Sequence, residues 1–455
     1  MGREIDTPED CDFVNVLISG GRRLVKTVYM SFNTDIIHGG HMRIIQEAAK
    51  LGELTVGVLS DSVVASYKRF PMLSTKERMS IAAGLSGVRH VVEQNSLVGE
   101  DILRRMKPDF LVHGDDWKTG VQTPARERVI TILAEWGGQL REFPYSRNQE
   151  YDAMEAHARS QLSIPDILRG RLKKLLAIKP LVNAIEVHSG LTGLIAEEEK
   201  FVKDGVVSQF DAMWVSSLCD STAKGKPDIE LVDVTSRLRT IDDIMEVTTK
   251  PIIFDGDTGG QIEHFSYIIK TLERIGVSAV IVEDKTGMKR NSLFGTDVKQ
   301  EQDSIENFSY KINTGKNAMK TSDMLLIARI ESLILERGMD DALSRAFAFV
   351  EAGADGIMIH SRRNEPDEIF EFCKKFRNAN QSTPLVVVPS TFTSVTESEF
   401  EQRGINIVIY ANHLTRSAVP AMRKAARLIL EHRRAEEADG ICMPINEIIK
   451  LIPEV

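Results

Sequence analysis

Cysteine is scarce in this sequence, with four residues in a chain of 455. They stand at Cys11, Cys219, Cys373 and Cys442, without the paired spacing of a disulfide framework or the ligand spacing of a zinc site. This scarcity excludes a small disulfide-stapled fold and is typical of reduced thiols in a cytosol. We therefore expect a cytoplasmic protein.

Long hydrophobic runs are also missing. No apolar stretch approaches the roughly 20 residues that a membrane-spanning helix needs. The amino-terminal segment has acidic residues where a secretory signal requires a positive region, and its apolar run is short and interrupted. We expect neither a membrane span nor a secretory leader.

An excess of basic charge is absent as well. The chain has 57 Lys and Arg residues against 66 Asp and Glu residues, which gives a net charge of -9. This balance argues against a protein that binds nucleic acid by neutralising its phosphates. Any anionic ligand must therefore be held by a local site.

The overall composition and the length of the chain indicate an ordinary globular protein with more than one hydrophobic core. Apolar residues make up 42% and charged residues 27% of the chain, and a single core seldom serves so long a chain. A polar, charged stretch between Arg147 and Arg171 is the best candidate for a boundary. We predict two domains, residues 1–158 and 159–455.

The first domain alternates short apolar runs with amphipathic stretches. The apolar runs predict strands at residues 28–30, 54–59, 89–94, 109–114 and 139–144. The amphipathic stretches predict helices at residues 41–52, 74–85, 100–107 and 125–137. Such alternation predicts parallel strands joined by right-handed crossovers, so we expect a small Rossmann-like α/β domain.

The second domain repeats this alternation over a longer series. Eight runs predict strands at residues 181–189, 212–217, 251–257, 279–284, 324–331, 356–361, 385–390 and 405–410. A helical pattern follows each of them, after one basic amphipathic helix at residues 167–180. Eight strands with helices between them predict a closed (β/α)8 barrel.

A glycine turn with two histidines follows the first predicted strand. His38 and His41 flank Gly39 and Gly40 at the predicted start of a helix. The free N–H groups and positive dipole end of such a helix suit a phosphate chain, and the imidazoles can donate hydrogen bonds to a transferring phosphate. The alternative is a plain glycine turn with two surface histidines.

This segment resembles the HxGH cytidylyltransferases, which use CTP as a substrate. The resemblance implies that His38, His41 and Lys68 act on the triphosphate. It further implies that Arg78 binds phosphate and that Asp115, Asp116 and Trp117 shape the site for nucleotide and acceptor. In place of the family's Ser/Thr-rich turn, Arg126, Arg128 or Arg147 is a candidate to supply the charge. Residues 144–153 replace the family's Ser/Thr-rich turn, so a nucleotide-binding module without transfer activity stays an alternative.

Acidic residues stand at the carboxyl ends of two predicted barrel strands, where barrel chemistry is found. Asp255 and Asp257 follow the third strand, and Glu283 ends the fourth. Carboxylate oxygens are the ligands that Mg²⁺ prefers. We predict a magnesium site here, with a solvated acidic rim as the alternative.

A polar loop follows the fourth predicted barrel strand. It carries Lys285, Lys289 and Asn291, and we expect it to be too hydrophilic for burial and able to close over an anion. Arg329 ends the fifth strand, and its planar guanidinium group is suited to bind a carboxylate or a phosphate. His360 ends the sixth, where a structural histidine and a ligand contact are equally compatible with the pattern.

These segments resemble the isocitrate lyase and phosphoenolpyruvate mutase superfamily, and within it the mutase branch. In that branch the loop gates the site, and the position of Asn291 separates mutases from phosphonopyruvate hydrolases. The resemblance implies that Asp228 assists the Mg²⁺ ligands and that Arg329, Asn291 and His360 hold the phosphoryl group, with Lys289 in the gating loop. It implies that the enolate lies against Ser216, Ser217 and Leu218.

Together the halves resemble the bifunctional enzymes of fosfomycin biosynthesis. The resemblance implies isomerisation of phosphoenolpyruvate to phosphonopyruvate, and CMP transfer from CTP to a phosphonate such as 2-hydroxyethylphosphonate. It also implies a dimer or tetramer formed through the barrel by exchange of its last helix. The helical run at residues 417–438 is compatible with this exchange and equally with packing on its own barrel. A barrel that acts as a hydrolase or lyase stays an alternative.

Overall fold

The computed structural model describes residues 25–33, 35–144 and 149–452. The chain forms two compact units. One holds residues up to 162 together with 200–209, and the other holds residues 163–199 and 210–455. Cys11 and the segment 145–148 lie outside the described residues. No helix in the described ranges has the length and apolar character to cross a bilayer.

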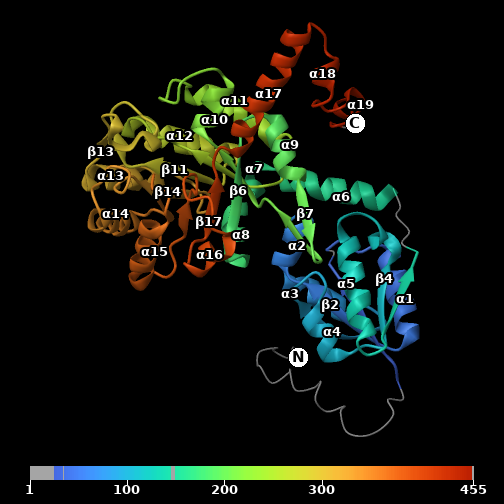
Figure 1. Ribbon diagram of the computed structural model, residues 1–455. Helices are drawn as coiled ribbons and strands as arrows, with labels where there is room; N and C mark the ends of the chain where they lie inside the picture. Colours follow the sequence, from blue (N-terminus) through green and yellow to red (C-terminus); the bar gives the residue numbers. More distant parts are fainter. Residues whose placement is uncertain (1–24, 34, 145–148, 453–455) are drawn as a thin grey trace. The chain divides into compact units, whose positions relative to one another are not determined.

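The smaller unit is built on a parallel sheet with the strand order β3-β2-β1-β4-β5 (Figure 1). Its strands are β1 (Thr27–Phe32), β2 (Glu53–Leu59), β3 (Val88–Gln94), β4 (Phe110–Gly114) and β5 (Gln139–Phe143). Its α-helices are α1 (Gly39–Leu51), α2 (Asp61–Tyr67), α3 (Thr75–Ala83), α4 (Glu100–Met106), α5 (Thr123–Ala134) and α6 (Gln149–Leu162). The predicted Rossmann-like fold is confirmed.

Helices cover both faces of this sheet because successive residues of a strand point to opposite sides. Val28 and Met30 of β1 pack with Ile45 of α1 in one buried cluster. Tyr29, between them, packs with Leu103 of α4 in the cluster on the other face. The central strand β1 is thus buried on both sides, and its carboxyl end is the part left open for a ligand.

An antiparallel hairpin completes the smaller unit. It consists of β7 (Lys200–Lys203) and β8 (Val206–Gln209). In chain order it lies inside the second series, just before a barrel strand, yet it belongs to the smaller unit. The sequence pattern predicts no strand at these residues.

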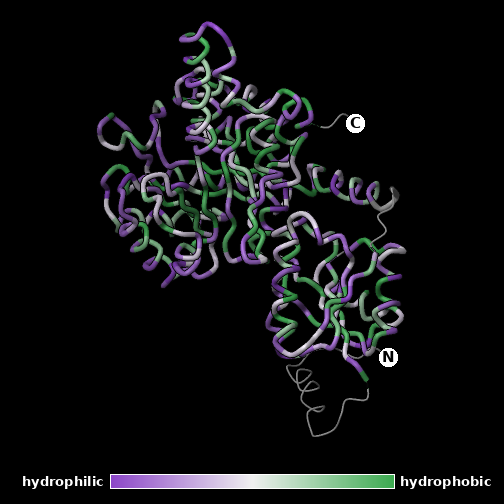
Figure 2. The backbone as a smooth tube through the Cα atoms, turned by 45° about the vertical axis from the view of Figure 1, so that its right-hand side comes forward, coloured by the Kyte–Doolittle hydropathy of each residue, from purple (hydrophilic) through white to green (hydrophobic). Residues whose placement is uncertain are grey.

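The larger unit is a closed parallel barrel with the order β10-β11-β14-β15-β16-β17-β6-β9. Its strands are β6 (Val182–Val187), β9 (Ala212–Val215), β10 (Ile252–Asp255), β11 (Ala279–Glu283), β14 (Leu325–Ile330), β15 (Gly356–Ile359), β16 (Leu385–Val387) and β17 (Ile407–Tyr410). The tube in Figure 2 is hydrophobic along these inner strands and more hydrophilic on the surrounding helices. The predicted eight-stranded barrel is confirmed.

The helices that lead into and surround the barrel pack apolar faces on its strands. They are α7 (Pro165–Arg169), α8 (Arg171–Ile178), α9 (Gly190–Glu198), α10 (Ser217–Ala223), α11 (Val234–Met245), α12 (Ile262–Ile275), α13 (Ile305–Ala318), α14 (Met339–Glu351), α15 (Asp367–Ala379) and α16 (Glu397–Gln402). The basic helix predicted at residues 167–180 is divided at Gly170 into α7 and α8. Three helices end the chain: α17 (His413–His432), α18 (Glu436–Asp439) and α19 (Ile445–Ile448).

A loop closed by a small ladder follows the fourth barrel strand. The antiparallel strands β12 (Lys285–Thr286) and β13 (Glu301–Gln302) pair with each other, and the 3-10 segment η4 (Ser292–Asp297) lies between them. We call residues 285–302 the gating loop. Its place at the carboxyl end of β11 puts it over the barrel mouth.

Candidate active sites

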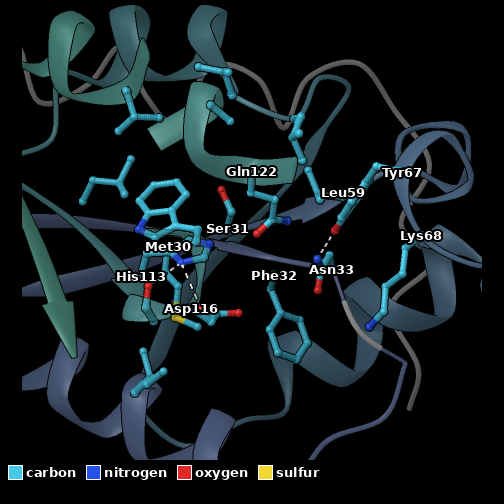
Figure 3. Close-up of a pocket in the computed structure, with 18 of the residues that line it drawn as sticks. Met30, Ser31, Phe32, Asn33, Leu59, Tyr67, Lys68, His113, Asp116 and Gln122 are labelled. Carbon is cyan, nitrogen blue, oxygen red and sulfur yellow. Dashed lines mark hydrogen bonds and ion pairs between the residues drawn. The ribbon is translucent and has the colours of Figure 1, made fainter. Parts of the chain in front are cut away.

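The smaller unit has a cavity of about 620 Å³ at the carboxyl ends of its central strands (Figure 3). This volume lies within the range of about 300–1,000 Å³ that small-molecule sites occupy. Of the residues predicted from sequence, His41, Lys68, Asp116 and Trp117 line it. The cavity therefore joins the glycine turn to the segment after β4, although they are far apart in the sequence.

The two histidines of the glycine turn lie together at the start of α1. Their ring centroids are 4.0 Å apart. His38 is the N-cap of α1, and its Nδ1 accepts a hydrogen bond of 3.0 Å from the N–H of Gly40. The neutral ring therefore carries its proton on Nε2, where it can be donated to an anion. Burial, with help from His38 and Lys68, lowers the pKa of His41 to about 3.

Lys68 follows α2 and lines the cavity, where Figure 3 shows its side chain beside that of Asn33. Its Nζ lies 3.7 Å from a carboxylate oxygen of Glu155 on α6. The next residue, Arg69, is buried and pairs with both Glu155 at 2.8 Å and Asp35 at 2.7 Å. The ion pairs of Arg69 fix the chain at the point where Lys68 enters the cavity.

Four of the predicted residues do not line this cavity, namely His38, Arg78, Asp115 and Arg126. The guanidinium of Arg78 is buried, and it donates to the carbonyl oxygens of Leu59 and Leu73 and to the carboxylate of Asp61. Arg78 thus holds α3 against the end of β2. The sequence shows the cation but not the carbonyl groups that surround it.

Arg126 acts on the cavity through two other side chains. It donates two hydrogen bonds, of 2.7 and 2.9 Å, to the carboxylate of Glu142, which also accepts one of 2.8 Å from the indole N–H of Trp117. Trp117 stacks on His113 with ring centroids 3.8 Å apart. Hydrogen bonding to Arg126 lowers the pKa of Glu142 to about 2. The charged pair therefore orients an aromatic wall of the cavity.

Six polar residues that line this cavity were not predicted. They are Ser31, Asn33, Tyr67, His113, Thr119 and Gln122. Asn33 donates a hydrogen bond to the hydroxyl of Tyr67. Ser31 and His113 lie near the carboxyl ends of the parallel strands β1 and β4, a position that could have singled them out. The other four carry no comparable signal, because their roles depend on contacts between separate segments.

The barrel has a second, smaller cavity of about 70 Å³ at the carboxyl ends of its strands. Most of the residues predicted for the barrel line it. They are Ser216, Ser217, Leu218, Asp228, Asp255, Glu283, Lys289, Asn291, Arg329 and His360. Asp257 does not line the cavity, but it accepts a hydrogen bond from Lys289. The structure thus brings the predicted groups of six separate segments together.

Lys289 is the centre of the acidic side of this cavity. Its ammonium group donates to Asp257, to Asp228 at 2.6 Å and to the hydroxyl of Ser217 at 2.6 Å. Burial alone would lower the pKa of Lys289, but Asp257, Asp255 and Asp228 raise it above its ordinary value. The ammonium group is therefore charged and balances carboxylates that would otherwise repel one another.

The carboxylates around Lys289 have the chemistry of a site for a hard divalent cation. Asp255 accepts hydrogen bonds from the N–H and hydroxyl of Ser217 at 3.1 and 2.9 Å. The buried Oε1 of Glu283 accepts no hydrogen bond from the described part of the chain. It has only an ion pair, with Lys285 Nζ at 3.2 Å, among these residues. Within the described ranges, no three acidic, His or Cys side chains converge as a ready metal cluster. The oxygen donors fit Mg²⁺, and the neighbouring ammonium groups supply the compensating charge.

The opposite side of the cavity is basic. Arg329 donates to Glu331 at 2.6 Å, to the hydroxyl of Ser292 at 2.7 Å and to Nδ1 of His360 at 3.0 Å. Because a guanidinium can only donate, Nδ1 of His360 accepts and Nε2 carries the proton. Burial and the adjacent Arg329 lower the pKa of His360, which keeps the ring neutral. The pair presents two kinds of N–H donor to an anion.

The gating loop corrects one expectation from the sequence. It was predicted to be too hydrophilic for burial, yet Lys285 and Lys289 are only 3% and 6% exposed. The reason is charge pairing, since Lys285 lies near Glu283 and Glu331 and Lys289 near Asp228 and Asp257. Met288, in contrast, is exposed. The loop is therefore anchored by its charged residues.

Two further buried residues support the barrel site and were not predicted. Arg237 of α11 donates to the carbonyl oxygen of Asp255 at 2.6 Å and to the carboxylate of Asp257 at 3.0 Å. Glu331, directly after β14, accepts from Arg329. A polar residue after a barrel strand is a signal that could have indicated Glu331, whereas Arg237 lies within a helix and gives no such signal.

Both halves of the chain match known families. The family model described as Phosphoenolpyruvate phosphomutase matches residues 172–430, and the one described as Cytidylyltransferase-like matches residues 33–163. A phosphoenolpyruvate phosphomutase of Tetrahymena pyriformis is 34% identical over 282 residues, which cover 62% of this chain and 90% of the relative. A phosphonopyruvate hydrolase of a Variovorax species is 35% identical over 273 residues, which cover 60% of this chain and 90% of the relative.

Solved structures agree with these matches. The crystal structure of a phosphoenolpyruvate phosphomutase from Streptomyces platensis subsp. rosaceus has a TM-score of 0.57 and 29% identity, and the match covers 62% of this chain and 93% of that one. A phosphonopyruvate hydrolase in complex with oxalate and Mg²⁺ has a TM-score of 0.56 and 32% identity, and the match covers 62% of this chain and 94% of that one. Both mutases and hydrolases are therefore similar to the larger unit.

Proposed function

Because this chain belongs to the phosphoenolpyruvate phosphomutase family, we propose that its barrel interconverts phosphoenolpyruvate and phosphonopyruvate. The observation that carries the proposal is the small cavity with a carboxylate side around Asp255 and a basic side around Arg329. A substrate with an enolate and a phosphoryl group needs both kinds of neighbour. The carboxylates would hold a cation that stabilises the oxyanions, and the basic side would bind the phosphoryl group directly.

The reaction exchanges one bond to phosphorus for another. The bond between phosphorus and the enol oxygen breaks, and carbon 3 of the enolate captures the phosphoryl group, so no proton is gained or lost. A loose transition state of this kind depends on positioning and on charge stabilisation. In this proposal Arg329, Asn291 and the Nε2–H of His360, all of which line the cavity, would hold the phosphoryl oxygens while the phosphoryl group moves.

Mg²⁺ fits the carboxylate side and is part of the proposal, since a related hydrolase structure contains it with oxalate. Asp255, Asp257 and Glu283 would hold the ion, with Asp228 assisting. When bound, the ion supplies positive charge to the enolate and carboxylate oxygens of the substrate. Ser217, which donates to Asp255, fixes the orientation of that carboxylate.

Exclusion of water separates a mutase from a hydrolase, because water would capture the phosphoryl group. Asn291 of the gating loop donates a hydrogen bond of 3.0 Å to Asp228, and Lys289 pairs with the same carboxylate. These contacts close the loop over a cavity of only about 70 Å³. The closed loop and the asparagine at this position favour the mutase over the hydrolase.

Incubation with phosphonopyruvate and Mg²⁺, followed by phosphorus NMR, tests the barrel proposal. Formation of phosphoenolpyruvate is expected. Accumulation of free phosphate and pyruvate would instead identify a hydrolase. In Asp255→Ala we expect the conversion to be lost while the barrel remains folded, and retained activity would contradict the metal assignment.

We propose in addition that the smaller unit transfers CMP from CTP to a phosphonate, with release of pyrophosphate. Support comes from the 620 Å³ cavity and from the Nε2–H of His38 at the amino end of α1. Pyrophosphate release with CTP and either 2-hydroxyethylphosphonate or 2-aminoethylphosphonate tests this. Saturable binding of CTP without turnover would favour a nucleotide-binding module.

We also propose that the chain assembles into a dimer or tetramer through its last helices. No residue of α17 is buried, although Met422, Ile429 and Leu430 are large and apolar. Exposed apolar surface of this kind is commonly covered by a second copy. Light scattering should give a multiple of the chain mass, and Leu430→Glu should reduce it; a monomeric unaltered protein would refute the proposal.

A further inference from the structure

The hairpin of β7 and β8 follows α9 in the chain but packs beside α2 of the smaller unit (Figure 1). Its turn is formed by Asp204 and Gly205, both with positive φ, as a two-residue hairpin turn requires. The flanking strands pair from Lys200 with Gln209 to Lys203 with Val206. The hairpin is thus a short, defined element rather than an irregular loop.

The base of the hairpin caps the carboxyl end of α2. The last four carbonyl groups of a helix lack partners within it. Lys200 donates from Nζ to the carbonyl oxygen of Tyr67 at 3.0 Å, and Gln209 donates to that of Ala65 at 2.6 Å. Gln209 also reaches the carbonyl oxygen of Lys68 at 3.5 Å. Two hairpin side chains therefore hold the turn from which Tyr67 and Lys68 enter the cavity.

Apolar contacts hold the rest of the hairpin against the same wall. Val207 is buried in a cluster with Leu59, Val64 and Tyr67. At the tip, a Cβ on Gly205 would lie 2.9 Å from Cγ2 of Val98, so the backbone there is packed directly on that side chain. Leu59, Tyr67 and Val98 all line the cavity. The hairpin thus supports the outer side of the cavity wall along its length.

We propose that this hairpin is a positioning element of the nucleoside triphosphate site of the smaller unit. Lys200 and Gln209 are its positioning residues: they fix the last turn of α2, so that the ammonium group of Lys68 and the hydroxyl of Tyr67 face the ligand. Figure 3 shows both of these side chains on one side of the cavity, with the Tyr67 hydroxyl directed at Asn33. The inference rests on the proposed nucleotide-binding function and adds a second chain segment to that site.

The test compares two lysines of the same strand in the full-length protein. Lys200→Met removes the cap on Tyr67, whereas Lys203→Met alters an exposed lysine of the same hairpin. We expect Lys200→Met to raise the KM for CTP about five- to tenfold, the effect of one lost hydrogen bond, with a smaller change in kcat. Lys203→Met should leave both unchanged, and Lys200→Arg, which keeps a donor, should restore most of the affinity.

Hydrogen exchange of the α2 amides provides a second measurement. The N–H of Lys68 donates to the carbonyl oxygen of Val64, and we expect its exchange to be faster in Lys200→Met alone. Equal KM values for CTP in Lys200→Met and Lys203→Met would overturn the inference and leave the nucleotide site standing. Failure of the unaltered protein to bind CTP would refute the nucleotide site itself, and the inference with it.

Discussion

Lys289 and Asp228 form an ion pair of 2.6 Å between two separate loops at the barrel mouth. Lys289 lies in the gating loop after the fourth strand, and Asp228 lies between α10 and α11 after the second. Asn291 donates to the other oxygen of the same carboxylate at 3.0 Å. One aspartate therefore fastens the gating loop at two points, and the loop cannot open without breaking both.

Asn291→Ala should weaken this closure and divert the barrel reaction toward water. A hydrogen bond to a charged group contributes about 1.5–3 kcal/mol, so we expect conversion of phosphonopyruvate to phosphoenolpyruvate to fall by roughly 10- to 100-fold. The share of free phosphate among the products should rise, as followed by phosphorus NMR. Met288→Ala, at an exposed position of the same loop, is the matched control. An unchanged product ratio in Asn291→Ala would contradict a closing role.

The depressed pKa of His41 predicts a pH-dependent stability of the smaller unit. Its folded pKa is about 3, whereas an unfolded histidine has a pKa of about 6.5. The unfolded state therefore binds the proton more tightly, and the stabilisation present above about pH 6.5 is lost as the pH falls toward 3. Allowing for partial exposure, we expect a loss of about 1–2 kcal/mol between pH 7 and pH 5.

Hydrogen exchange of β1 at the two pH values, corrected for the intrinsic exchange rate, measures this change. In His41→Asn the pH dependence should be smaller than in the unaltered protein. His90→Asn alters an exposed histidine of β3 and should have no such effect. The same pH dependence in His41→Asn and the unaltered protein would show that His41 is not the group responsible.

Arg126 and Glu142 should affect CTP binding as one unit. Because both act through Trp117, Arg126→Leu and Glu142→Gln should each raise the KM for CTP about threefold to tenfold. The double variant should be no worse than either single one, since interacting residues are not additive. Steady-state kinetics of the four proteins make the comparison. A large effect confined to Arg126→Leu would mean that Arg126 contacts the ligand itself.

The buried pairs of Arg69 should contribute much more stability than a surface pair. Arg69→Met leaves Asp35 buried and uncompensated, and we expect a loss of about 3–5 kcal/mol in the free energy of unfolding of the smaller unit. Arg89→Met breaks an exposed pair with Glu53 and should cost about 0–1 kcal/mol. Urea unfolding measures both. A comparable loss in the two variants would contradict the burial argument.

The fold and the grouping of residues at the barrel mouth could largely be predicted from the sequence, because each signal lies within one short segment. Each barrel strand is a short apolar run, and residues such as Asp255, Glu283 and Arg329 stand at its carboxyl end, where closure of the barrel brings them together. Both family resemblances and both fold classes are confirmed. The roles of the individual residues stay predictions until the variants are measured.

The contacts that could not be predicted from the sequence depend on partners that are distant in the chain. Arg78 and Arg126 were recognised as cations, but groups that accept their hydrogen bonds come from other elements of the smaller unit. Lys285 was predicted to be a solvated loop residue, because the sequence does not show that Glu331, which follows another strand, lies beside it. A pattern along one segment identifies a charge but does not identify the opposite charge that meets it.

The place of the hairpin in the chain also sets an order of events during synthesis. The sheet of the smaller unit is complete once β5 has emerged from the ribosome, but the caps on α2 emerge only after the first barrel strand and α9. At translation rates of about 5–20 residues per second, this delay lasts about 3–13 s. The nascent chain therefore passes through a stage in which the sheet has formed and one wall of the pocket is still unsupported. A fragment that ends at residue 162 would remain at that stage.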